Sequence, residues 1–324
     1  MKRRDFLKAA GATAIGGFAV TRASAQPTTW PNKPVKLILP YAPGGATDLI
    51  GRPWAEKLGA AFGQPFVIEN RGGASGAIGT EAVMKSPNDG YTFLLTPSAP
   101  FTILPILRKT PYDPVKDFAP VARVGDLISG FVVHPSVGVK TFPELIEYAK
   151  KNPGKLSFGS AGLGTSTHMR IEFLNYRAKI ESLHVPYRGS ADALNDLLAG
   201  QIHLMNEINP LPHVRAGKLI LLNVNSPNRS AEWPGIPTLT ELGYPNSDVP
   251  SWYSIQAPAG TSADIIAKLN AKVVEIGKTQ EMQATLTKLS VSLPFQTPAE
   301  MTEFLKNDIK GNTEVIKAAN IKLE

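Results

Sequence analysis

Two glycine-rich segments place small and polar residues directly before a predicted helix. The first is Pro40–Asp48, and the second runs from Gly159 to His168. Glycine lets the backbone turn tightly and exposes its N–H groups, and a helix start adds unsatisfied N–H donors and a partial positive charge. Both segments therefore have the chemistry that binds a carboxylate or phosphate, although a structural turn explains the first segment equally well.

Single side chains in these segments have two interpretations. Asp48 either caps the following helix, which its chemistry favours, or accepts a hydrogen bond from a ligand hydroxyl, an amine or a bound water. Thr165, Ser166 and Thr167 supply hydroxyl donors beside the second helix start. His168 either forms a nucleophile–base pair with Ser166 or, as the favoured interpretation, orients the loop or touches an anion.

Two other segments favour structural roles. Arg71–Gly79 is rich in glycine, but its spacing is not that of a dinucleotide-binding loop, so we expect turns and helix packing. Arg188 either pairs with a ligand carboxylate or holds neighbouring loops of the same structural unit together, and the second role is favoured.

Signatures of enzymes, cofactors and metal sites are missing from the sequence. Gly162-x-Gly164 lacks the third glycine of a dinucleotide fingerprint, no P-loop is present, and there is no Gly-x-Ser-x-Gly elbow. The five histidines lack the spacing of metal ligands, and the absence of cysteine excludes disulfides and thiolate metal sites. We therefore expect no catalytic residue, no metal and no cofactor.

Strand and helix patterns alternate along the chain, which indicates an α/β architecture. Strands are predicted at residues 35–39, 66–69, 91–96, 130–134, 155–158, 219–224 and 252–256. Helices are predicted at 48–62, 141–151, 167–178, 191–198, 262–276 and from 297 onward. Pro53 is expected to kink the first helix or to delay its start. Thr141 with Glu144, and Thr297 with Glu300, have capping-box spacing.

These elements group into two α/β units, with a C-terminal part that rejoins the first unit. We expect lobe 1 over residues 27–127, lobe 2 over 128–228, and the C-terminal part of lobe 1 over 229–324. Ligand sites in such folds lie beyond the carboxyl ends of strands and between domains. The two glycine-rich segments are therefore expected to face one another across a cleft.

The first 26 residues have the features of an export signal. Arg3 to Lys8 matches the twin-arginine pattern, a short apolar run follows, and Ala23–Ala25 fits a small-x-small cleavage site before Gln26. The formal net charge of +7 falls to +3 without this segment, because the segment holds five basic residues and one acidic residue. So mild a charge excludes a nucleic-acid binder and is compatible with an anionic ligand.

A series of short motifs runs through most of the chain. They are Trp30–Val35, Pro40–Asp48, Gly63–Pro65, Glu69–Ala74, Asp89–Thr92, Pro111–Asp113, Asp117–Phe118, the 159–168 loop, His184–Gly189, Ala216–Leu219, Ala257–Thr261 and Ala319–Lys322. In this order, the motifs resemble those of the periplasmic receptors of tripartite tricarboxylate transporters, the Bug family.

The resemblance implies an α/β, two-lobed periplasmic-binding-protein fold of type II that closes on a small carboxylate: a tricarboxylate, a dicarboxylate, an amino acid or an aromatic acid. It implies that the two glycine-rich loops hold the carboxylate through backbone N–H groups, hydroxyls and bridging waters. The residues so implied are Tyr41, Ala42, Pro43, Gly44, Gly45, Thr47, Asp48, Ser160, Gly162, Gly164, Thr165, Ser166 and His168.

The chain departs from the family pattern near residue 203. The usual aspartate is replaced by His203, and Met205–Pro210 is unusual and shorter by about two residues. We expect Asn206 and Glu207 to lie near the distal end of the ligand, where they can recognise an amide, an amine or a hydroxyl.

The resemblance predicts a monomeric periplasmic receptor, with no catalytic activity, that captures a small carboxylate and passes it to the membrane subunits of a transporter. One alternative is a sensory receptor for the same ligands that docks on a signalling protein. Another is a periplasmic hydrolase on the same scaffold that uses Ser166 and His168.

Overall fold

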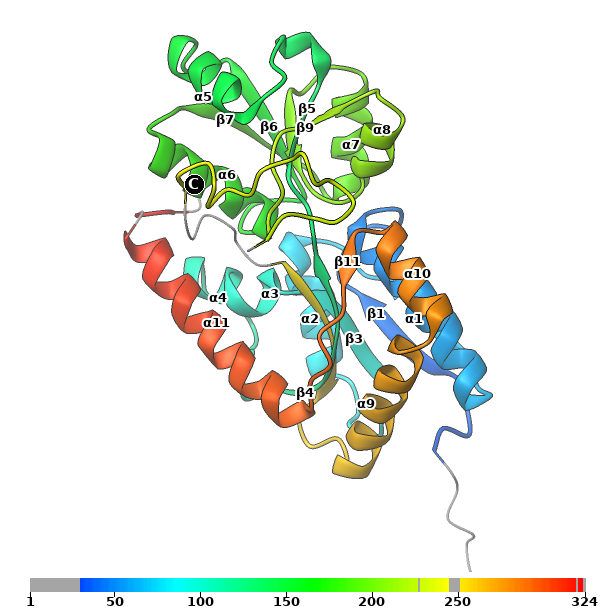
Figure 1. Ribbon diagram of the computed structural model, residues 1–324. Coiled ribbons are helices and arrows are strands. Elements are labelled where there is room, and N and C mark those ends of the chain that lie inside the picture. The colour runs from blue at the N-terminus through cyan, green and yellow to red at the C-terminus, as the bar shows by residue number, and fades with distance from the viewer. Residues whose placement is uncertain (1–29, 227, 245–250, 319, 323–324) are drawn as a thin grey trace, which may run out of the picture.

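The computed structural model describes residues 30–226, 228–244, 251–318 and 320–322. The predicted export signal over residues 1–26, with its cleavage site near Ala25, lies outside the described residues. Within the described ranges, no helix has both the length and the apolar character needed to cross a bilayer. The chain forms two α/β units, one above the other in Figure 1, each built around its own sheet.

The first unit contains a six-stranded sheet in the order β11-β4-β10-β3-β1-β2. Its strands are β1 (Val35–Leu39), β2 (Phe66–Asn70), β3 (Thr92–Pro97), β4 (Phe118–Leu127), β10 (Trp252–Pro258) and β11 (Val291–Ser292). Strand β1 pairs in parallel with β2 and β3, whereas β10 runs antiparallel to β3 and β4. The carboxyl ends of β1 and β3 therefore lie at the same edge of this sheet.

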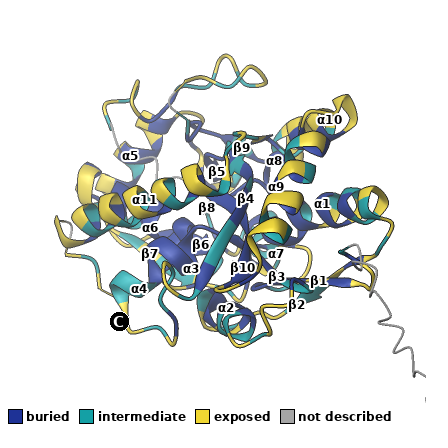
Figure 2. Ribbon diagram, turned by 90° about the horizontal axis from the view of Figure 1, so that it is seen from below, coloured by how far each residue is buried: buried dark blue, intermediate teal, exposed yellow. Residues whose placement is uncertain are grey.

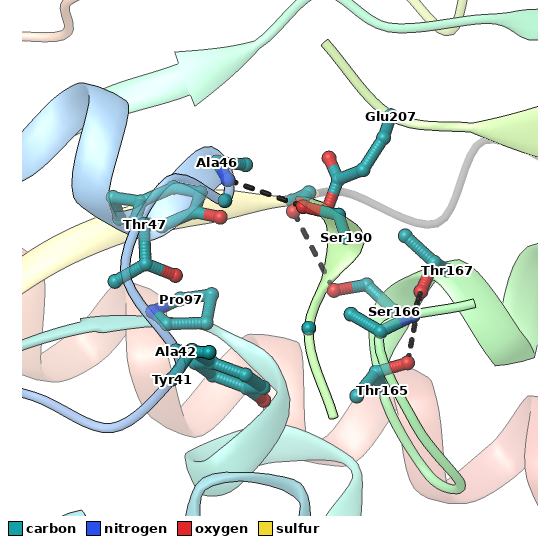
Figure 3. Close-up of a pocket in the computed structure, with 15 residues that line it drawn as sticks. Tyr41, Ala42, Ala46, Thr47, Pro97, Thr165, Ser166, Thr167, Ser190 and Glu207 are labelled. Carbon is teal, nitrogen blue, oxygen red and sulfur yellow. Dashed lines mark hydrogen bonds between the residues drawn. The ribbon is translucent and has the colours of Figure 1, made fainter. Parts of the chain in front are cut away.

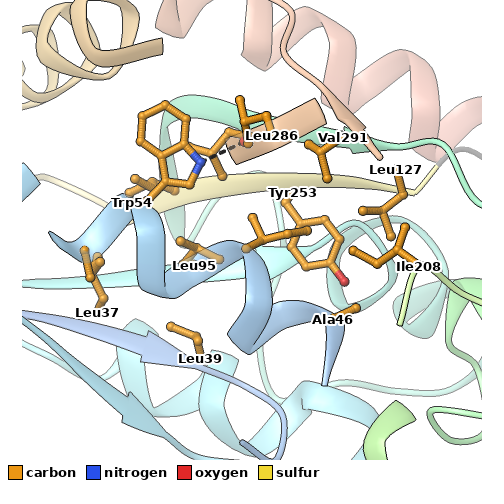
Figure 4. Close-up of a cluster of buried hydrophobic side chains, with 14 of the residues drawn as sticks. Leu37, Leu39, Ala46, Trp54, Leu95, Leu127, Ile208, Tyr253, Leu286 and Val291 are labelled. Carbon is orange, nitrogen blue, oxygen red and sulfur yellow. Dashed lines mark hydrogen bonds between the residues drawn. The ribbon is translucent and has the colours of Figure 1, made fainter. Parts of the chain in front are cut away.

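Helices cover both faces of this sheet. They are α1 (Ala46–Phe62), α2 (Ala77–Met84), α3 (Ala99–Thr102), α4 (Leu104–Leu107), α9 (Ala263–Gly277), α10 (Gln280–Lys288) and α11 (Pro298–Ala318), with a 3-10 turn at Ala74–Gly76. One core joins α1, α9 and α10 to the sheet, with the fully buried Trp54 donating its indole N–H to the Val124 carbonyl at 2.9 Å (Figure 4). A second core joins α2, α3 and α11 to the other face.

The second unit contains a five-stranded sheet in the order β7-β6-β8-β5-β9. Its strands are β5 (Phe131–Val133), β6 (Leu156–Ser160), β7 (Ser182–Pro186), β8 (Leu204–Asn206) and β9 (Ile220–Leu221). Its helices are α5 (Phe142–Lys151), α6 (Ser166–Ala178), α7 (Ser190–Leu198) and α8 (Leu211–Arg215), with a 3-10 turn at Pro135–Val137. In both units the inner strands β1, β3, β10, β5, β6 and β8 are mostly buried, the edge strands β2 and β7 are partly exposed, and the helices turn exposed faces outward (Figure 2).

The order of the elements explains how two separate chain segments build the first unit. Its strands come from residues 35–127 and 252–292, and those of the second unit come from residues 131–221. The chain therefore leaves the first sheet after β4 and returns to it as β10. The lobe boundaries expected at residues 127 and 228 stay a prediction.

The helix starts follow the sequence pattern closely. Capping boxes at Thr141 with Glu144 and at Thr297 with Glu300 begin α5 and α11, as predicted. The expectation that Pro53 delays the first helix is wrong, because α1 already begins at Ala46 and contains Pro53. The apolar face of α1, which includes the fully buried Trp54, outweighs the hydrogen bond that proline removes.

Candidate ligand-binding site

A small cavity lies between the two units, where the strands that carry the glycine-rich loops end (Figure 3). Its volume of about 20 Å³ matches roughly one water molecule. The first unit supplies Tyr41, Ala42, Gly45, Ala46, Thr47, Pro97, Ser251 and Tyr253, and the second supplies Ala161, Thr165, Ser166, Thr167, Gly189, Ser190 and Glu207. The two predicted loops thus face one another across the interface between the units.

Three helix starts converge on this cavity. The first residues of α1, α6 and α7 are Ala46, Ser166 and Ser190, and all three line it. Each helix start carries unsatisfied N–H groups and a partial positive charge. The N-cap residues of α1 and α7 are Gly45 and Gly189, which supply no capping side chain. The Ala46 N–H of α1 is bonded to the Ser190 hydroxyl instead. The cavity is therefore built to receive a negative group.

Polar contacts hold the two units together around the cavity. The Ala46 N–H donates to the Ser190 hydroxyl across the interface at 3.2 Å. The hydroxyls of Ser166 and Ser251 lie 3.4 Å apart, also across the interface. Figure 3 marks the contact between Ala46 and Ser190 with a dashed line. Around this small cavity the two units are therefore in direct contact.

Asp48 lies beside the cavity but not in its lining. Its carboxylate accepts hydrogen bonds from the Gly44 N–H at 3.0 Å and from the Arg52 guanidinium at 2.7 and 3.0 Å. The Asn70 amide donates a weaker bond at 3.3 Å. Burial raises the pKa of Asp48, but the bonds from Arg52, Gly44 and Asn70 outweigh it and hold the pKa below its usual value. These contacts fasten the loop; Pro43 and Gly44 are exposed and also lie outside the lining.

Thr165 organises the second loop. As the N-cap of α6, its hydroxyl accepts from the His168 N–H at 3.3 Å and donates to the Gly162 carbonyl at 2.7 Å. The His168 ring in turn accepts from the Gly164 N–H at 3.1 Å. Ser160 bonds through its hydroxyl to the Gly162 carbonyl at 3.3 Å. Ser160, Gly162, Gly164 and His168 therefore shape the loop from outside the cavity lining.

His168 stacks on His184, with ring centroids 4.0 Å apart. Burial, together with the neighbouring His168, lowers the pKa of His184 to about 4. Among the described residues, no hydrogen bond joins His168 to Ser166, whose hydroxyl instead faces Ser251. This geometry does not provide the nucleophile–base contact that a hydrolase needs.

Asn206 and Glu207 have separate environments although they are adjacent. Asn206 is fully buried, and its side-chain oxygen accepts from Ser129, Asn225 and Arg170 at 2.8 to 3.2 Å. Glu207 lines the cavity. Burial raises the pKa of Glu207 to about 7, against the lowering effect of Arg170.

A wider cavity of about 330 Å³ adjoins the first and shares Tyr41 and Ala161 with it. Arg108 of the first unit and Arg188 of the second both line it. The Arg108 guanidinium donates to the Ala74 carbonyl at 2.7 Å. No group of residues within the described ranges has the composition and spacing of a metal site.

Sequence reasoning assigned no site role to part of the lining. The residues concerned are Pro97, Gly189, Ser190, Ser251 and Tyr253. Gly189 and Ser190 had a usable signal, because they form a third glycine-containing junction between a strand and a helix. Tyr253 had none, because it lies within a fully buried strand whose neighbours are known only from the fold.

Comparison with known proteins decides the family. Residues 50–321 match the family model described as tripartite tricarboxylate transporter family receptor. The chain belongs to this family. It is 35% identical to protein BugT of Bordetella pertussis over 317 residues, which cover 96% of this chain and 97% of BugT.

Solved structures agree with this assignment. The structure of the periplasmic binding protein BugD is 31% identical, with a TM-score of 0.86, and the match covers 91% of this chain and 100% of BugD. Rpa4515 of R. palustris, whose structure was solved with adipate, is 32% identical to this chain, with a TM-score of 0.86. The match covers 90% of this chain and 99% of Rpa4515. The expected fold, a two-unit α/β solute-binding protein, is therefore confirmed, and the chain is a receptor of the tripartite tricarboxylate transporter family.

Proposed function

We propose that this receptor traps a small carboxylate between its two units and presents it, in the closed form, to the membrane subunits of a transporter. The observation that carries this proposal is the convergence of the α1, α6 and α7 starts on one cavity between the units. The adipate bound to the similar protein Rpa4515 supports the same ligand class.

The energetics require several donors. A helix start contributes about 0.3–1 kcal/mol to the binding of an anion. Hydrogen bonds to a charged group contribute about 1.5–3 kcal/mol each. Micromolar affinity corresponds to about 8 kcal/mol, so the carboxylate must receive several N–H and hydroxyl bonds at once. The loops at Tyr41–Thr47 and Thr165–Thr167 together offer that number.

In this proposal, Pro43, Gly44, Asp48, Ser160, Gly162, Gly164 and His168 act by holding the two loops in shape. The receptor acts without catalysis, which is supported by the separation of Ser166 from His168 and by the binding proteins that it resembles. No cofactor takes part. We further propose that residues 1–26 direct twin-arginine export, that cleavage near Ala25 releases a periplasmic receptor, and that the receptor acts as a monomer.

A binding screen tests the proposed function. The purified mature protein is titrated by calorimetry and thermal shift with mono-, di- and tricarboxylates, and with neutral sugars of similar size as the control. Carboxylates are expected to raise the melting temperature and the sugars to leave it unchanged. Stabilisation by sugars, with none by any acid, would reject the carboxylate site.

A further inference from the structure

Glu207 is a buried acid at the centre of the candidate site. It follows β8 directly, is only 5% exposed, and lines the cavity between the units. In Figure 3 its side chain extends toward Ser190, at the start of α7. The lining residues include no other Asp or Glu, and no Lys, Arg or His. Among the described residues, Glu207 is therefore the only lining side chain that can carry a formal charge.

Few of the described groups compensate the carboxylate of Glu207. In the described part of the chain it accepts one hydrogen bond, from the backbone N–H of Ile208 at 3.3 Å. Arg170 of α6 acts on it electrostatically, but the Arg170 guanidinium donates to the carbonyl and side-chain oxygens of Asn206 at 3.2 Å. A buried carboxylate with spare acceptor capacity favours a ligand group that donates hydrogen bonds or carries a positive charge.

The cavity thus presents two opposite preferences a short distance apart. The three helix starts favour an anion, whereas Glu207 opposes a second negative charge near it. A ligand with both a carboxylate and an ammonium group satisfies both preferences at once. A plain carboxylate offers Glu207 no donor of its own and favours the protonated form of Glu207.

We propose that the ligand of this receptor is an amino acid, whose carboxylate binds at the starts of α1, α6 and α7 and whose ammonium group pairs with Glu207. This inference rests on the proposed function and narrows its ligand class.

The proposal has a consequence for pH. Burial raises the pKa of Glu207, whereas Arg170 on α6 and the Ile208 N–H lower it. Burial, together with the negative charge of Glu207, in turn raises the pKa of Tyr41 in the first loop and of Tyr253 on β10 well above the working range, so neither tyrosine titrates near neutral pH. Glu207, with a pKa of about 7, titrates there. Since an ammonium group binds the ionised carboxylate, amino acid affinity should rise about tenfold from pH 6 to pH 8.

A plain carboxylate should show the opposite slope, because it binds better when Glu207 is protonated. The experiment therefore compares matched pairs that differ only in the amine: L-alanine with propionate, L-aspartate with succinate, and L-glutamate with glutarate. Affinities are measured by calorimetry at pH 6, 7 and 8 on the wild type, on Glu207→Gln and on Glu147→Gln. Glu147 is an exposed glutamate on α5 in the same unit, paired with Lys151, and serves as the matched control.

At pH 8 the wild type and Glu147→Gln are expected to bind the amino member of at least one pair about tenfold more tightly or better. Glu207→Gln should lose that preference and the rise with pH. If Glu207→Gln does not fold, the wild-type pH slopes decide the question alone. Equal or tighter binding of the plain acids at pH 8 would overturn this inference and leave the proposed function standing, whereas failure of every acid to bind would overturn both.

Discussion

Asp48 shows how a single residue beside the site can act through the backbone. Its side chain is only 5% exposed and receives bonds from Gly44, Arg52 and Asn70. Gly44 belongs to the first loop, whereas Asn70 ends β2 and also donates to the Tyr41 carbonyl at 3.1 Å. The carboxylate therefore ties the loop to the start of α1 and to the neighbouring strand.

Replacing Asp48 by asparagine should destabilise the protein. The charge-assisted bond to Arg52 is lost, so we expect the free energy of unfolding to fall by about 1–3 kcal/mol at pH 7. The pKa of Asp48 is lower in the folded state than its usual value. Its contribution to stability is therefore present above that usual value and is lost as the pH falls through the folded pKa. Urea denaturation at pH 7 and at pH 3 measures both effects.

The exposed Asp264, in the first turn of α9, provides the control as Asp264→Asn. Its replacement should change the free energy of unfolding by less than about 1 kcal/mol. If Asp48→Asn abolishes ligand binding but leaves stability intact, Asp48 contacts the ligand directly and its holding role is wrong.

At the scale of elements, the site repeats one construction three times. A strand ends, a short loop containing glycine turns, and a helix begins with its N–H groups toward the cavity. This holds for β1 and α1, for β6 and α6, and for β7 and α7. Only α6 has a capping side chain at its start, which is Thr165.

Removing the Thr165 hydroxyl tests that cap. Thr165→Ala should lower the free energy of unfolding by about 0.5–2 kcal/mol, because the His168 N–H loses its acceptor. It should also weaken ligand binding, because the Gly162 carbonyl is no longer held. Thermal denaturation and calorimetry measure the two effects. Thr165→Ser keeps the hydroxyl and is expected to retain most of the stability and most of the ligand affinity. If Thr165→Ser lost as much stability as Thr165→Ala, the capping role would be contradicted.

The same repeated construction explains which elements and loops of the site were predicted from the sequence. Strands such as Val35–Leu39 and helices with capping boxes carry local patterns, so residues 40–48 and 159–168 were identified as facing loops. Strand β4 was missed, since Pro120 and Gly125 interrupt its pattern and its partner β10 lies more than a hundred residues away. Ser251 and Tyr253 reach the cavity only through that long-range pairing. For Asp48 the chemistry favoured a capping role and the family resemblance implied a ligand role, because sequence spacing does not show which way a side chain points.

At the scale of the whole molecule, the approach of the two units brings the helix starts together. Ala42, Gly44 and Gly45 of the first unit lie against Gly189, Ser190 and Ala191 of the second, so the helix starts meet only when the units are together. A ligand that bridges them binds the closed form more tightly and shifts the population toward it. A change that only obstructs closure should therefore lower affinity without unfolding either unit.

Gly45→Ala provides such an obstruction. Gly45 has φ −82° and ψ −179°, which alanine adopts without strain. Its new Cβ would lie 3.1 Å from the Ser190 hydroxyl oxygen and 3.6 Å from the Ser190 nitrogen. We expect the binding free energy of the ligand to weaken by about 1–3 kcal/mol, which is typical of overpacking. Small-angle scattering should show a more open protein than the wild type at the same ligand concentration. The free energy of unfolding without ligand should change by less than about 1 kcal/mol.

The double variant Gly45→Ala/Ser190→Ala shows whether the contact between the new Cβ and the Ser190 hydroxyl causes the loss of ligand affinity. Ser190→Ala alone loses the bond from the Ala46 N–H and should also bind ligand more weakly. Because it removes the oxygen that the new Cβ meets first, the two losses should overlap, and the double variant should bind more tightly than their sum predicts. Gly235→Ala, whose Cβ would meet no atom within 4 Å, is the control and should bind as the wild type does. Strictly additive losses would mean that affinity does not depend on closure at this contact.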